Sequence, residues 1–371
     1  MRTVCPKDMC AGCMACISIC KKDAIKIQDS LNSYNAIIDS KKCIDCGACE
    51  NVCQVNRQIE PMRKPKIWYQ GWATEEQIRE KSSSGGAATS IMRAFIKEGG
   101  LVCSCSYCSG NFGFLFAENL EEIDRFTGSK YVKSNPQGIY DQLKEYLKNG
   151  KKVLFLGLPC QVAAVKNYVG DKLLENLYTV DLICHGTPSP KVFDIFLQQY
   201  GKKLEEQISF KFRDKDMFQV AASGEYIVHK GAADCYSIAF LNSLIYTENC
   251  YSCQYACLNR ISDITLGDSW GSELEVSECK KGLSLVLVQT EKGREILNKS
   301  KMHLEDVDLN KAVAANHQLS HPSARCKNSP EFWECLKMGK KFNYLVWRRF
   351  PKICMRQSIK CLLLKMNIIH R

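Results

Sequence analysis

After residue 65, short apolar runs alternate with amphipathic stretches along most of the chain. Continuous apolar runs predict strands that are buried on both faces at residues 152–158, 177–184 and 284–289. Apolar positions at helical spacing predict helices at residues 87–98, 137–148, 161–168, 190–203 and 292–300. Alternating polar and apolar positions predict half-exposed strands at residues 207–212 and 225–229. Strands that alternate with helices predict an α/β domain with a mixed sheet.

The N-terminal segment is organised differently, because its cysteines repeat with an offset of 33 residues. The two copies consist of Cys10, Cys13, Cys16 and Cys20, and of Cys43, Cys46, Cys49 and Cys53. Pro61 and Pro65 follow the repeat and indicate a linker. We therefore predict a small module at residues 1–58, a linker at 59–66, a larger domain at 67–330 and a basic tail at 331–371.

Cysteine is unusually frequent, with 23 cysteines in 371 residues. A chain of this length is not a small disulfide scaffold, and residues 1–20 contain no apolar run of the kind that a secretion signal requires. We therefore expect a cytoplasmic protein. In that compartment clustered thiols serve first as metal ligands or redox groups.

Both copies of the repeat have the spacing C-x2-C-x2-C-x3-C. In two-cluster ferredoxins of the bacterial type, the last cysteine of each run binds the cluster of the other run. The predicted [4Fe-4S] ligands are therefore Cys10, Cys13, Cys16 and Cys53 for one cluster, and Cys43, Cys46, Cys49 and Cys20 for the other. A pair of zinc knuckles is the alternative, although zinc sites usually separate two pairs of ligands by a longer spacer.

Two details depart from the ferredoxin pattern. Lys21 and Gln54 stand where ferredoxins usually have a proline after the last cysteine, which leaves every ligand in place but changes the loop. Cys5 lies outside the repeated spacing, and we expect it to play no part in the clusters.

Six short segments of the larger domain carry a resemblance to a known family. They are SSSGG at 82–86, GSKYV at 128–132, GLPCQ at 157–161, CHG at 184–186, CYSC at 250–253 and GDSWG at 267–271. Together they resemble the family of coenzyme F420 hydrogenase/dehydrogenase beta subunits, including members fused to a two-cluster ferredoxin. The resemblance extends to about residue 289 and implies a flavin-binding α/β domain, usually with FAD. A flavin handles both single electrons and hydride, which suits a position between clusters and a hydride donor or acceptor.

The resemblance makes Ser83, Ser84, Gly85 and Gly86 candidates for binding the flavin. They directly precede a predicted helix, whose N-terminus favours a pyrophosphate. An ordinary helix N-cap formed by Ser84 is the alternative interpretation. Lys130 is a further candidate for contact with a flavin phosphate or ring carbonyl, and its alternative is a solvated lysine.

Members of the family without a ferredoxin extension still hold a [4Fe-4S] cluster, so the resemblance implies ligands in the larger domain. Cys160, Cys184, Cys250 and Cys253 occupy the matching motifs. Cys257 competes with them, because it completes a C-x2-C-x3-C run with Cys250 and Cys253. Cys160 opens a predicted helix, a position that lowers the pKa of a thiol. A zinc site and buried reduced thiols are the alternatives.

His185 and Asp268 are the candidate catalytic residues. His185 follows Cys184 and can relay a proton, because histidine titrates near neutral pH. Asp268 belongs to the GDSWG segment and is expected to line the same pocket. The alternatives are a structural histidine and an acidic turn residue.

The net charge of +11 lies almost entirely in the tail. Residues 335–371 contain ten Lys and Arg and no Asp or Glu, which leaves +1 for the rest of the chain. Apolar and basic residues between 347 and 371 have roughly helical spacing and indicate an interfacial helix that docks on an acidic partner or on the inner face of a membrane. A solvated terminal helix is the alternative. No apolar stretch reaches the ~20 residues of a spanning helix, and no nucleic-acid-binding motif accompanies the charge.

We therefore expect an iron–sulfur flavoprotein oxidoreductase that passes electrons between ferredoxin clusters and a flavin. Hydride would be exchanged with a deazaflavin of the F420 type or with another small or glycan-related substrate. The electron partner would be a redox protein or a small-molecule donor or acceptor, and the sequence allows an oligomer. The alternatives are a non-enzymatic ferredoxin-like carrier or adaptor associated with polysaccharide biosynthesis, and a zinc-stabilised interaction protein.

Overall fold

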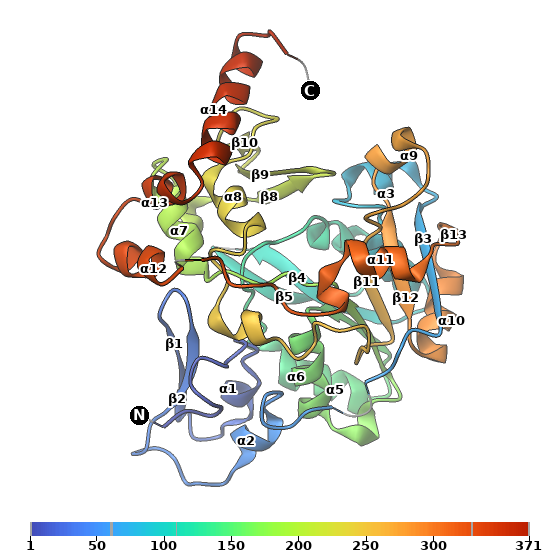
Figure 1. The fold of residues 1–371 in the computed structure, drawn as a ribbon. Coiled ribbons are helices and arrows are strands. Elements are labelled where there is room, and N and C mark those ends of the chain that lie inside the picture. Colours follow the sequence, from blue (N-terminus) through green and yellow to red (C-terminus); the bar gives the residue numbers. More distant parts are fainter. Residues whose placement is uncertain (1, 60–61, 109, 328, 370–371) are drawn as a thin grey trace.

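The computed structural model describes residues 2–59, 62–108, 110–327 and 329–369. A small N-terminal module, at the blue end of the colour range in Figure 1, combines one antiparallel hairpin with two short helices. Its elements are α1 (Ala15–Ile19), β1 (Ile25–Asp29), β2 (Tyr34–Ile38) and α2 (Ala48–Val52). Residues 60 and 61 of the predicted linker lie outside the described residues. Beyond them, Arg63 forms an isolated antiparallel bridge with Arg260, which holds the chain against the larger domain.

A mixed eight-stranded sheet lies at the centre of the larger domain. Its strands run in the order β13-β3-β12-β11-β7-β6-β4-β5. Their bounds are β3 (Ile67–Ala73), β4 (Leu101–Cys108), β5 (Asn111–Ala117), β6 (Val153–Gly157), β7 (Leu177–Leu182), β11 (Ile264–Asp268), β12 (Ser284–Val288) and β13 (Met302–Glu305). The four strands β4, β6, β7 and β11 are parallel to their neighbours in this set, and the outer strands pair antiparallel. The predicted α/β class with a mixed sheet is confirmed.

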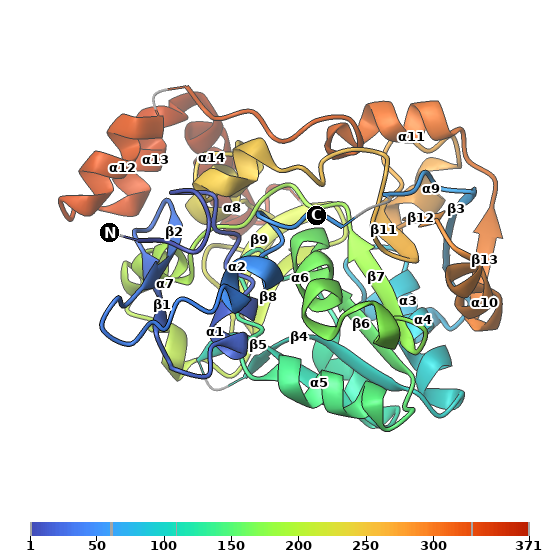
Figure 2. The same cartoon turned by 90° about the horizontal axis from the view of Figure 1, so that it is seen from below.

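Helices cover both faces of this sheet (Figures 1 and 2). They are α4 (Ala87–Lys97) and α10 (Glu291–Lys299) on one face, and α5 (Ile139–Lys148) and α6 (Pro159–Val169) on the other. Successive residues of β6 serve the two faces in turn, since Phe155 packs with α5 and α6 and Leu156 packs with α4. The N-terminal module shares the hydrophobic core of α5 and α6, so it is part of one packed unit with them.

A second core is built around a small antiparallel sheet. The sheet contains β8 (Phe210–Asp214), β9 (Met217–Ala222) and β10 (Glu225–Tyr226), in the order β10-β9-β8. Helices α7 (Pro190–Gln198), α8 (Cys235–Leu241), α12 (Ser329–Lys337) and α13 (Phe342–Arg349) pack with it. Aromatic rings fill this core, among them Phe193, Phe212 and Tyr236. The helix predicted at 190–203 is shorter than expected, because Gly201, with a φ of +67°, turns the chain away.

The remaining helices are shorter, apart from the last one. They are α3 (Glu76–Lys81), α9 (Val276–Lys280) and α11 (Leu309–Ala315), with 3-10 turns η1 (Glu121–Phe126), η2 (Asp171–Leu173), η3 (Leu204–Glu206), η4 (Glu248–Ser252) and η5 (His317–Leu319). Helix α14 (Pro351–Lys365) is the last helix of the described residues and projects from the body in Figure 1. None of the helices formed by the described residues has the length and apolar character needed to cross a membrane. The domain boundaries given above stay predictions.

Candidate functional site

The two copies of the cysteine repeat have the same backbone conformation. Gly12 and its counterpart Asp45 are both left-handed, with φ of 70° and 54°, and so are Met14 and its counterpart Gly47, with φ of 60° and 70°. A five-residue helix follows each loop. Left-handed residues within such a loop turn successive N–H groups toward one side, and backbone of this kind cradles anions and iron–sulfur clusters. The loops therefore suit a pair of clusters in conformation as well as in spacing.

The predicted ligands of the first cluster lie together in the interior of the module. Cys10, Cys13, Cys16 and Cys53 are 6–8% exposed, and burial raises the pKa of the thiols of Cys13 and Cys16. Cys5 is a fifth thiol at the same place. Its side chain hydrogen-bonds those of Cys10 and Cys53. Cys5 therefore lies against two of the predicted ligands, and the expectation that it takes no part in the clusters stays a prediction.

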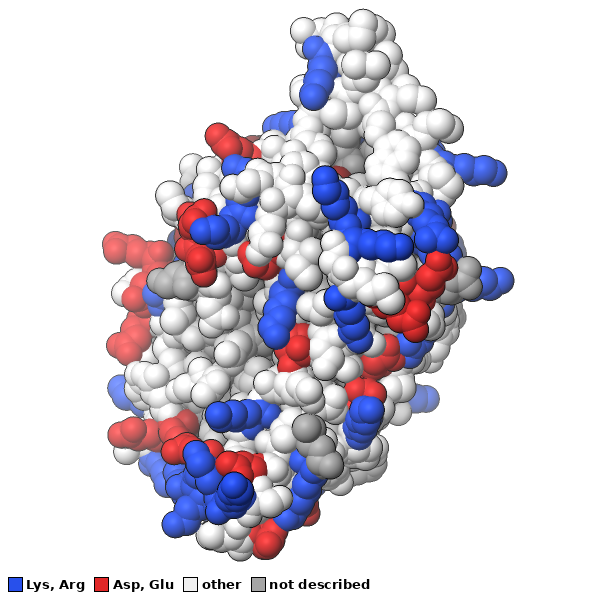
Figure 3. All heavy atoms as spheres, turned by 90° about the vertical axis from the view of Figure 1, so that its left-hand side faces the viewer, with Lys and Arg blue, Asp and Glu red and all other residues white. Residues whose placement is uncertain are grey.

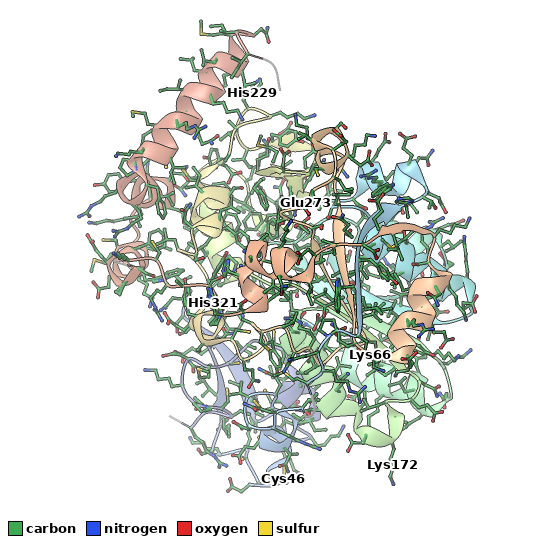
Figure 4. All side chains as sticks on the ribbon, turned by 45° about the vertical axis from the view of Figure 1, so that its right-hand side comes forward. Cys46, Lys66, Lys172, His229, Glu273 and His321 are labelled. Carbon is green, nitrogen blue, oxygen red and sulfur yellow. The ribbon has the colours of Figure 1, made fainter. Side chains whose placement is uncertain are left out.

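The predicted ligands of the second cluster lie nearer the surface. Cys46 is exposed and lies at the outer edge of the module (Figure 4), whereas Cys20, Cys43 and Cys49 are half-buried. Cys49 is close enough to interact electrostatically with Cys20 of its own set and with Cys16 of the first set. The module thus has one cysteine set near solvent and an adjoining set in the interior.

A pair of zinc knuckles is the alternative to two clusters in this module. Within the described part of the chain, no three His, Cys, Asp or Glu side chains converge on the position of a single metal ion. The ligands of a four-iron cluster surround a larger group than one ion, so their sulfur atoms stay further apart. The choice between clusters and zinc knuckles and the individual ligands stay predictions at this point.

A small cavity of about 90 Å³ brings together the four cysteines predicted for a third cluster. Cys160, Cys184, Cys250 and Cys253 all line it, and the thiol of Cys184 interacts with those of the other three. The Sγ atom of Cys257 instead donates to the backbone oxygens of Gln254 and Asn259, at 3.7 and 3.1 Å. The geometry thus favours the first four cysteines over the run that includes Cys257.

Cys160 shows how strongly the protein surroundings act on these thiols. It lies in the first turn of α6, as predicted. Burial nevertheless raises the pKa of its thiol to about 12, so the predicted lowering of the pKa is wrong for the chain by itself. Desolvation outweighs the helix dipole here. A bound metal centre would supply the positive charge that a thiolate needs at this buried position.

The N-terminal module forms one wall of this small cavity. Met9 and Ala11 of the first cysteine loop and Gln54 and Val55 after Cys53 line it. Lys133 crosses from the larger domain to the loop. Its Nζ donates to the backbone oxygen of Ala11 at 3.0 Å, and the side chain is almost completely buried. The hydrogen bond from Lys133 to Ala11 therefore joins the first cysteine loop to the cavity that the third cysteine set lines.

Lys133 places a positive charge between the two sites. Its Nζ lies 5.2 Å from the ring centre of Tyr34, and its charge acts on the thiols of both Cys10 and Cys160. Gly12 makes room for it, since a Cβ atom there would approach the Lys133 Cδ to 2.9 Å. Nothing in the sequence distinguishes Lys133 from an ordinary surface lysine.

Gln54 explains one departure from the ferredoxin pattern. Its buried side-chain oxygen accepts hydrogen bonds from Tyr255 Oη at 2.6 Å and from Gln254 Nε2 at 3.2 Å. A proline at this position would supply none of these contacts. The loop after Cys53 is thus held by bonds to the larger domain.

A larger cavity of about 430 Å³ adjoins the small one. Leu158 and residues 184–187 line both cavities. Much of the rest of the wall comes from the loops at 82–84 and 126–131, from the first half of α4, from β11 and from the small sheet. This volume is in the range of sites for small molecules and cofactors, and its wall combines apolar side chains with a few polar groups.

The SSSGG segment forms one side of the larger cavity, though not as predicted in every detail. Ser83, Ser84 and Gly86 line it. Gly85 instead packs against the sheet, and its N–H donates to Ser284 Oγ at 3.1 Å, so its assignment to the flavin is not supported by the fold. Gly86, in left-handed conformation with a φ of 92°, occupies the N-cap of α4. The alternative of an N-cap at Ser84 is wrong, because Ser84 Oγ donates to the oxygen of Leu283 at 2.7 Å.

Lys215 holds this loop from the small sheet. Its Nζ donates to the backbone oxygens of Arg79, of Ser82 at 2.8 Å and of Ser84 at 3.2 Å. Burial lowers the pKa of Lys215 to about 8. A single ammonium group therefore gathers three carbonyl oxygens at the end of α3 and fixes the loop that faces the cavity.

Replacing Lys215 with methionine is expected to weaken, about tenfold or roughly 1.4 kcal/mol, binding of the flavin that the family resemblance implies for this cavity, because charge-assisted hydrogen bonds that position the loop are lost. The measurement is a titration of the flavin-free protein with FAD, followed by fluorescence. Lys211→Met is the matched control, since Lys211 is exposed on the same hairpin and pairs with Asp214. Equal affinities of the two variants would contradict this role for Lys215.

Lys130 lines the larger cavity but is not a simply solvated side chain. Its Nζ donates to the backbone oxygens of Phe126 at 2.7 Å and Thr127 at 3.2 Å. Burial lowers the pKa of Lys130. The Lys130 ammonium group therefore stabilises the turn at Phe126 and Thr127. This turn forms part of the cavity wall.

His185 and Asp268 both line the larger cavity, as predicted for one pocket. Gln318 Nε2 lies 2.7 Å from His185 Nδ1, and with the Gln318 amide in this orientation it donates to Nδ1, so that a neutral ring carries its proton on Nε2. Enclosure lowers the pKa of His185 to about 4, so the ring is neutral at pH 7 and the expected pKa near neutrality is wrong. His185 can donate a hydrogen bond through Nε2.

The carboxylate of Asp268 has a partner that the sequence did not indicate. Arg213 donates to both of its oxygens, at 2.6 and 2.9 Å, from a buried position on β8. The guanidinium also lies 4.8 Å from the ring centre of Phe218 and 5.2 Å from that of Trp270. Asp268 and Arg213 thus form a polar wall beside two aromatic rings. Both oxygens of the Asp268 carboxylate accept hydrogen bonds from Arg213.

Comparisons with known proteins agree with this arrangement. Residues 68–137 match the family model of the coenzyme F420 hydrogenase/dehydrogenase beta subunit, N-terminal part, and residues 150–310 match the model of its C-terminal part. Residues 9–57 match the 4Fe-4S dicluster domain, which confirms the ferredoxin-type module.

Individual relatives are distant. One component of the F(420)H(2) dehydrogenase of Methanosarcina mazei is 22% identical over 291 residues, which are 71% of this chain and 78% of that protein. Among solved structures, a chain of the xenon-derivatised F420-reducing [NiFe] hydrogenase complex from Methanosarcina barkeri is 20% identical. That likeness covers 75% of this chain and 95% of the other, with a TM-score of 0.48.

Proposed function

Because the chain belongs to the family of coenzyme F420 hydrogenase/dehydrogenase beta subunits, we propose that it is an oxidoreductase that joins three [4Fe-4S] clusters to a flavin in the larger cavity. The observation that carries this proposal is the shared wall of the two cavities. Leu158 and residues 184–187 separate the four-cysteine cavity from the larger one, with Cys184 lining both. A ligand of the third cluster would therefore lie at the surface of the flavin site.

The three cysteine sets are arranged in the order that electron transfer requires. The set with exposed Cys46 lies at the surface, the set around buried Cys10 adjoins it, and the Cys160 set lies across the Lys133 contact. Each site is next to the following one. This order would let electrons pass between the surface and the larger cavity, from a set near solvent to a buried one.

Residues of this chain fit a flavin at several points of the larger cavity. Ser83 and the N-terminus of α4 at Gly86 offer a hydroxyl and amide groups to a phosphate, whereas the hydroxyl proton of Ser84 is used in its bond to Leu283. A bound flavin would supply the conversion between single electrons and hydride. The neutral ring of His185 would hold a hydrogen bond to it through Nε2. Trp270, 37% exposed, and the Arg213–Asp268 pair would limit which planar group can approach.

For the substrate, we propose a deazaflavin of the F420 type, because the wall near Trp270 and Phe218 is aromatic and suits a planar ring. Another small or glycan-related substrate is the second candidate. The relative from Methanosarcina mazei is one component of a dehydrogenase, which supports a redox protein as partner at the exposed end of the module. A non-enzymatic electron carrier is the competing function.

Purification without oxygen tests the proposal. The holoprotein is expected to carry about twelve irons, four per cluster, together with a flavin. Addition of F420H2 should bleach the flavin absorbance, and NAD(P)H and reduced ferredoxin are the comparison donors. Iron without flavin would establish the carrier instead, and a colourless protein with zinc would overturn both.

A further inference from the structure

Helix α14 has two apolar faces, and only one of them is packed. Cys354 and Leu364 are buried against the body, and Gln357 Oε1 accepts a hydrogen bond from the Ala233 backbone N–H at 3.0 Å. Met355, Ile359, Leu362 and Met366 recur at spacings of four, three and four residues. Side chains with this spacing share one face of a helix. They are 53–59% exposed and form what we call the outer stripe.

Positive charge accompanies the outer stripe. Lys352, Arg356 and Lys360, again four residues apart, form the adjacent row of the helix. Residues 335–371 contain no acidic side chain that would neutralise them. At the projecting end of the molecule, Figure 3 shows blue and white spheres. An exposed apolar row beside a basic row is the composition of a helix that lies in a lipid interface.

The preceding helix adds aromatic side chains of the kind that settle at such an interface. Trp347 and Tyr344 on α13 are 40% and 57% exposed. Tryptophan and tyrosine favour the headgroup region, because each combines an apolar ring with a polar group. Neighbouring exposed apolar side chains that are flanked by charge are typical of a binding face.

We propose that α13 and α14 dock the protein on a bilayer that contains anionic lipids, with the outer stripe inserted among the headgroups and the basic row on the phosphates. A lipid surface matches the evidence better than an acidic protein does. The side chains of the outer stripe are flexible or branched and carry no polar group. The charged side chains of the basic row are all positive. The proposal does not depend on the redox function.

Docking would set the orientation of the whole molecule. Helix α14 and the N-terminal module lie at opposite ends in Figure 1. With α14 on the bilayer, the exposed Cys46 edge would point away from the lipid. The module would then stay accessible to a redox partner in the aqueous phase.

Flotation of the full-length holoprotein with vesicles tests this. Binding is expected to vesicles of phosphatidylcholine with phosphatidylglycerol, to fall as salt rises, and to be absent with phosphatidylcholine alone. The variant Ile359→Glu/Leu362→Glu should lose binding. Ile208→Glu/Val276→Glu is the matched control, because both residues are exposed apolar side chains elsewhere on the surface, and it should bind normally.

The basic row has its own test. Replacing Lys352, Arg356 and Lys360 with glutamine should weaken binding about a hundredfold at low salt. The same replacement of the exposed Lys148, Lys151 and Lys172 removes equal charge elsewhere and should have little effect. Failure of the unaltered holoprotein to float with anionic vesicles at low salt would overturn the proposal. Retention on a polyglutamate matrix in that case would assign the tail to an acidic protein.

Discussion

Replacing Cys160 with serine is expected to remove four of about twelve irons per chain and to stop reduction of the bound flavin through the ferredoxin module. Cys160, with Cys184, Cys250 and Cys253, lines the small cavity that lies between the first cysteine loop and the larger cavity. Without the third cluster, no redox centre would remain in this gap. Iron analysis and stopped-flow spectra after mixing with reduced ferredoxin measure the two effects.

Cys257→Ser is the matched control for this experiment. Cys257 belongs to the same short run, but its thiol bonds backbone oxygens outside the cavity. This variant should keep all of its iron and its rate of flavin reduction. The ligand assignment would be contradicted if Cys257→Ser lost the iron and Cys160→Ser kept it, and the third cluster would be contradicted if neither variant lost iron.

Replacing Lys133 with methionine is expected to lower the reduction potential of the first or the third cluster by roughly 50–100 mV. The estimate is the Coulomb energy of one charge about 8 Å away at an effective dielectric constant of about 20. Reduction adds negative charge to a cluster, and the buried ammonium group of Lys133 stabilises that charge between the two sites. A redox titration followed by electron paramagnetic resonance gives the potentials.

Lys280→Met removes the same charge from an exposed position on α9, at the end of the molecule opposite the module. Its cluster potentials should be unchanged. Unaltered potentials in Lys133→Met would show that the ammonium group only supports packing, and would contradict its electrostatic role.

Local signals in the sequence were enough to predict the cysteine loops and most helices around the sheet. The repeated spacing identified the module, which the family match confirms. The buried strands β6, β7 and β12 stood out because they are continuous apolar runs. Strand β3 gave no such signal, since IWYQGWA mixes polar and apolar residues, and it owes its place to pairing with the distant β12 and β13.

Residues that connect distant parts of the chain could not be predicted. Lys133 meets Ala11, Gln54 meets Tyr255, and Arg213 meets Asp268, all of them contacts between segments far apart in the sequence. Each of these residues has an ordinary local neighbourhood. The pKa of Cys160 was unpredictable for the same reason, because it depends on burial by distant segments and not on the position of Cys160 at the start of a helix.

The central claim is that three clusters lie in line between the surface and the larger cavity. Electron paramagnetic resonance of the fully reduced holoprotein tests it most directly, because neighbouring paramagnetic clusters broaden and split each other's signals. We predict a coupled spectrum that loses one interacting partner in Cys160→Ser and is unchanged in Cys257→Ser. Three sharp, independent signals, or a spectrum that Cys160→Ser leaves as it was, would contradict the account.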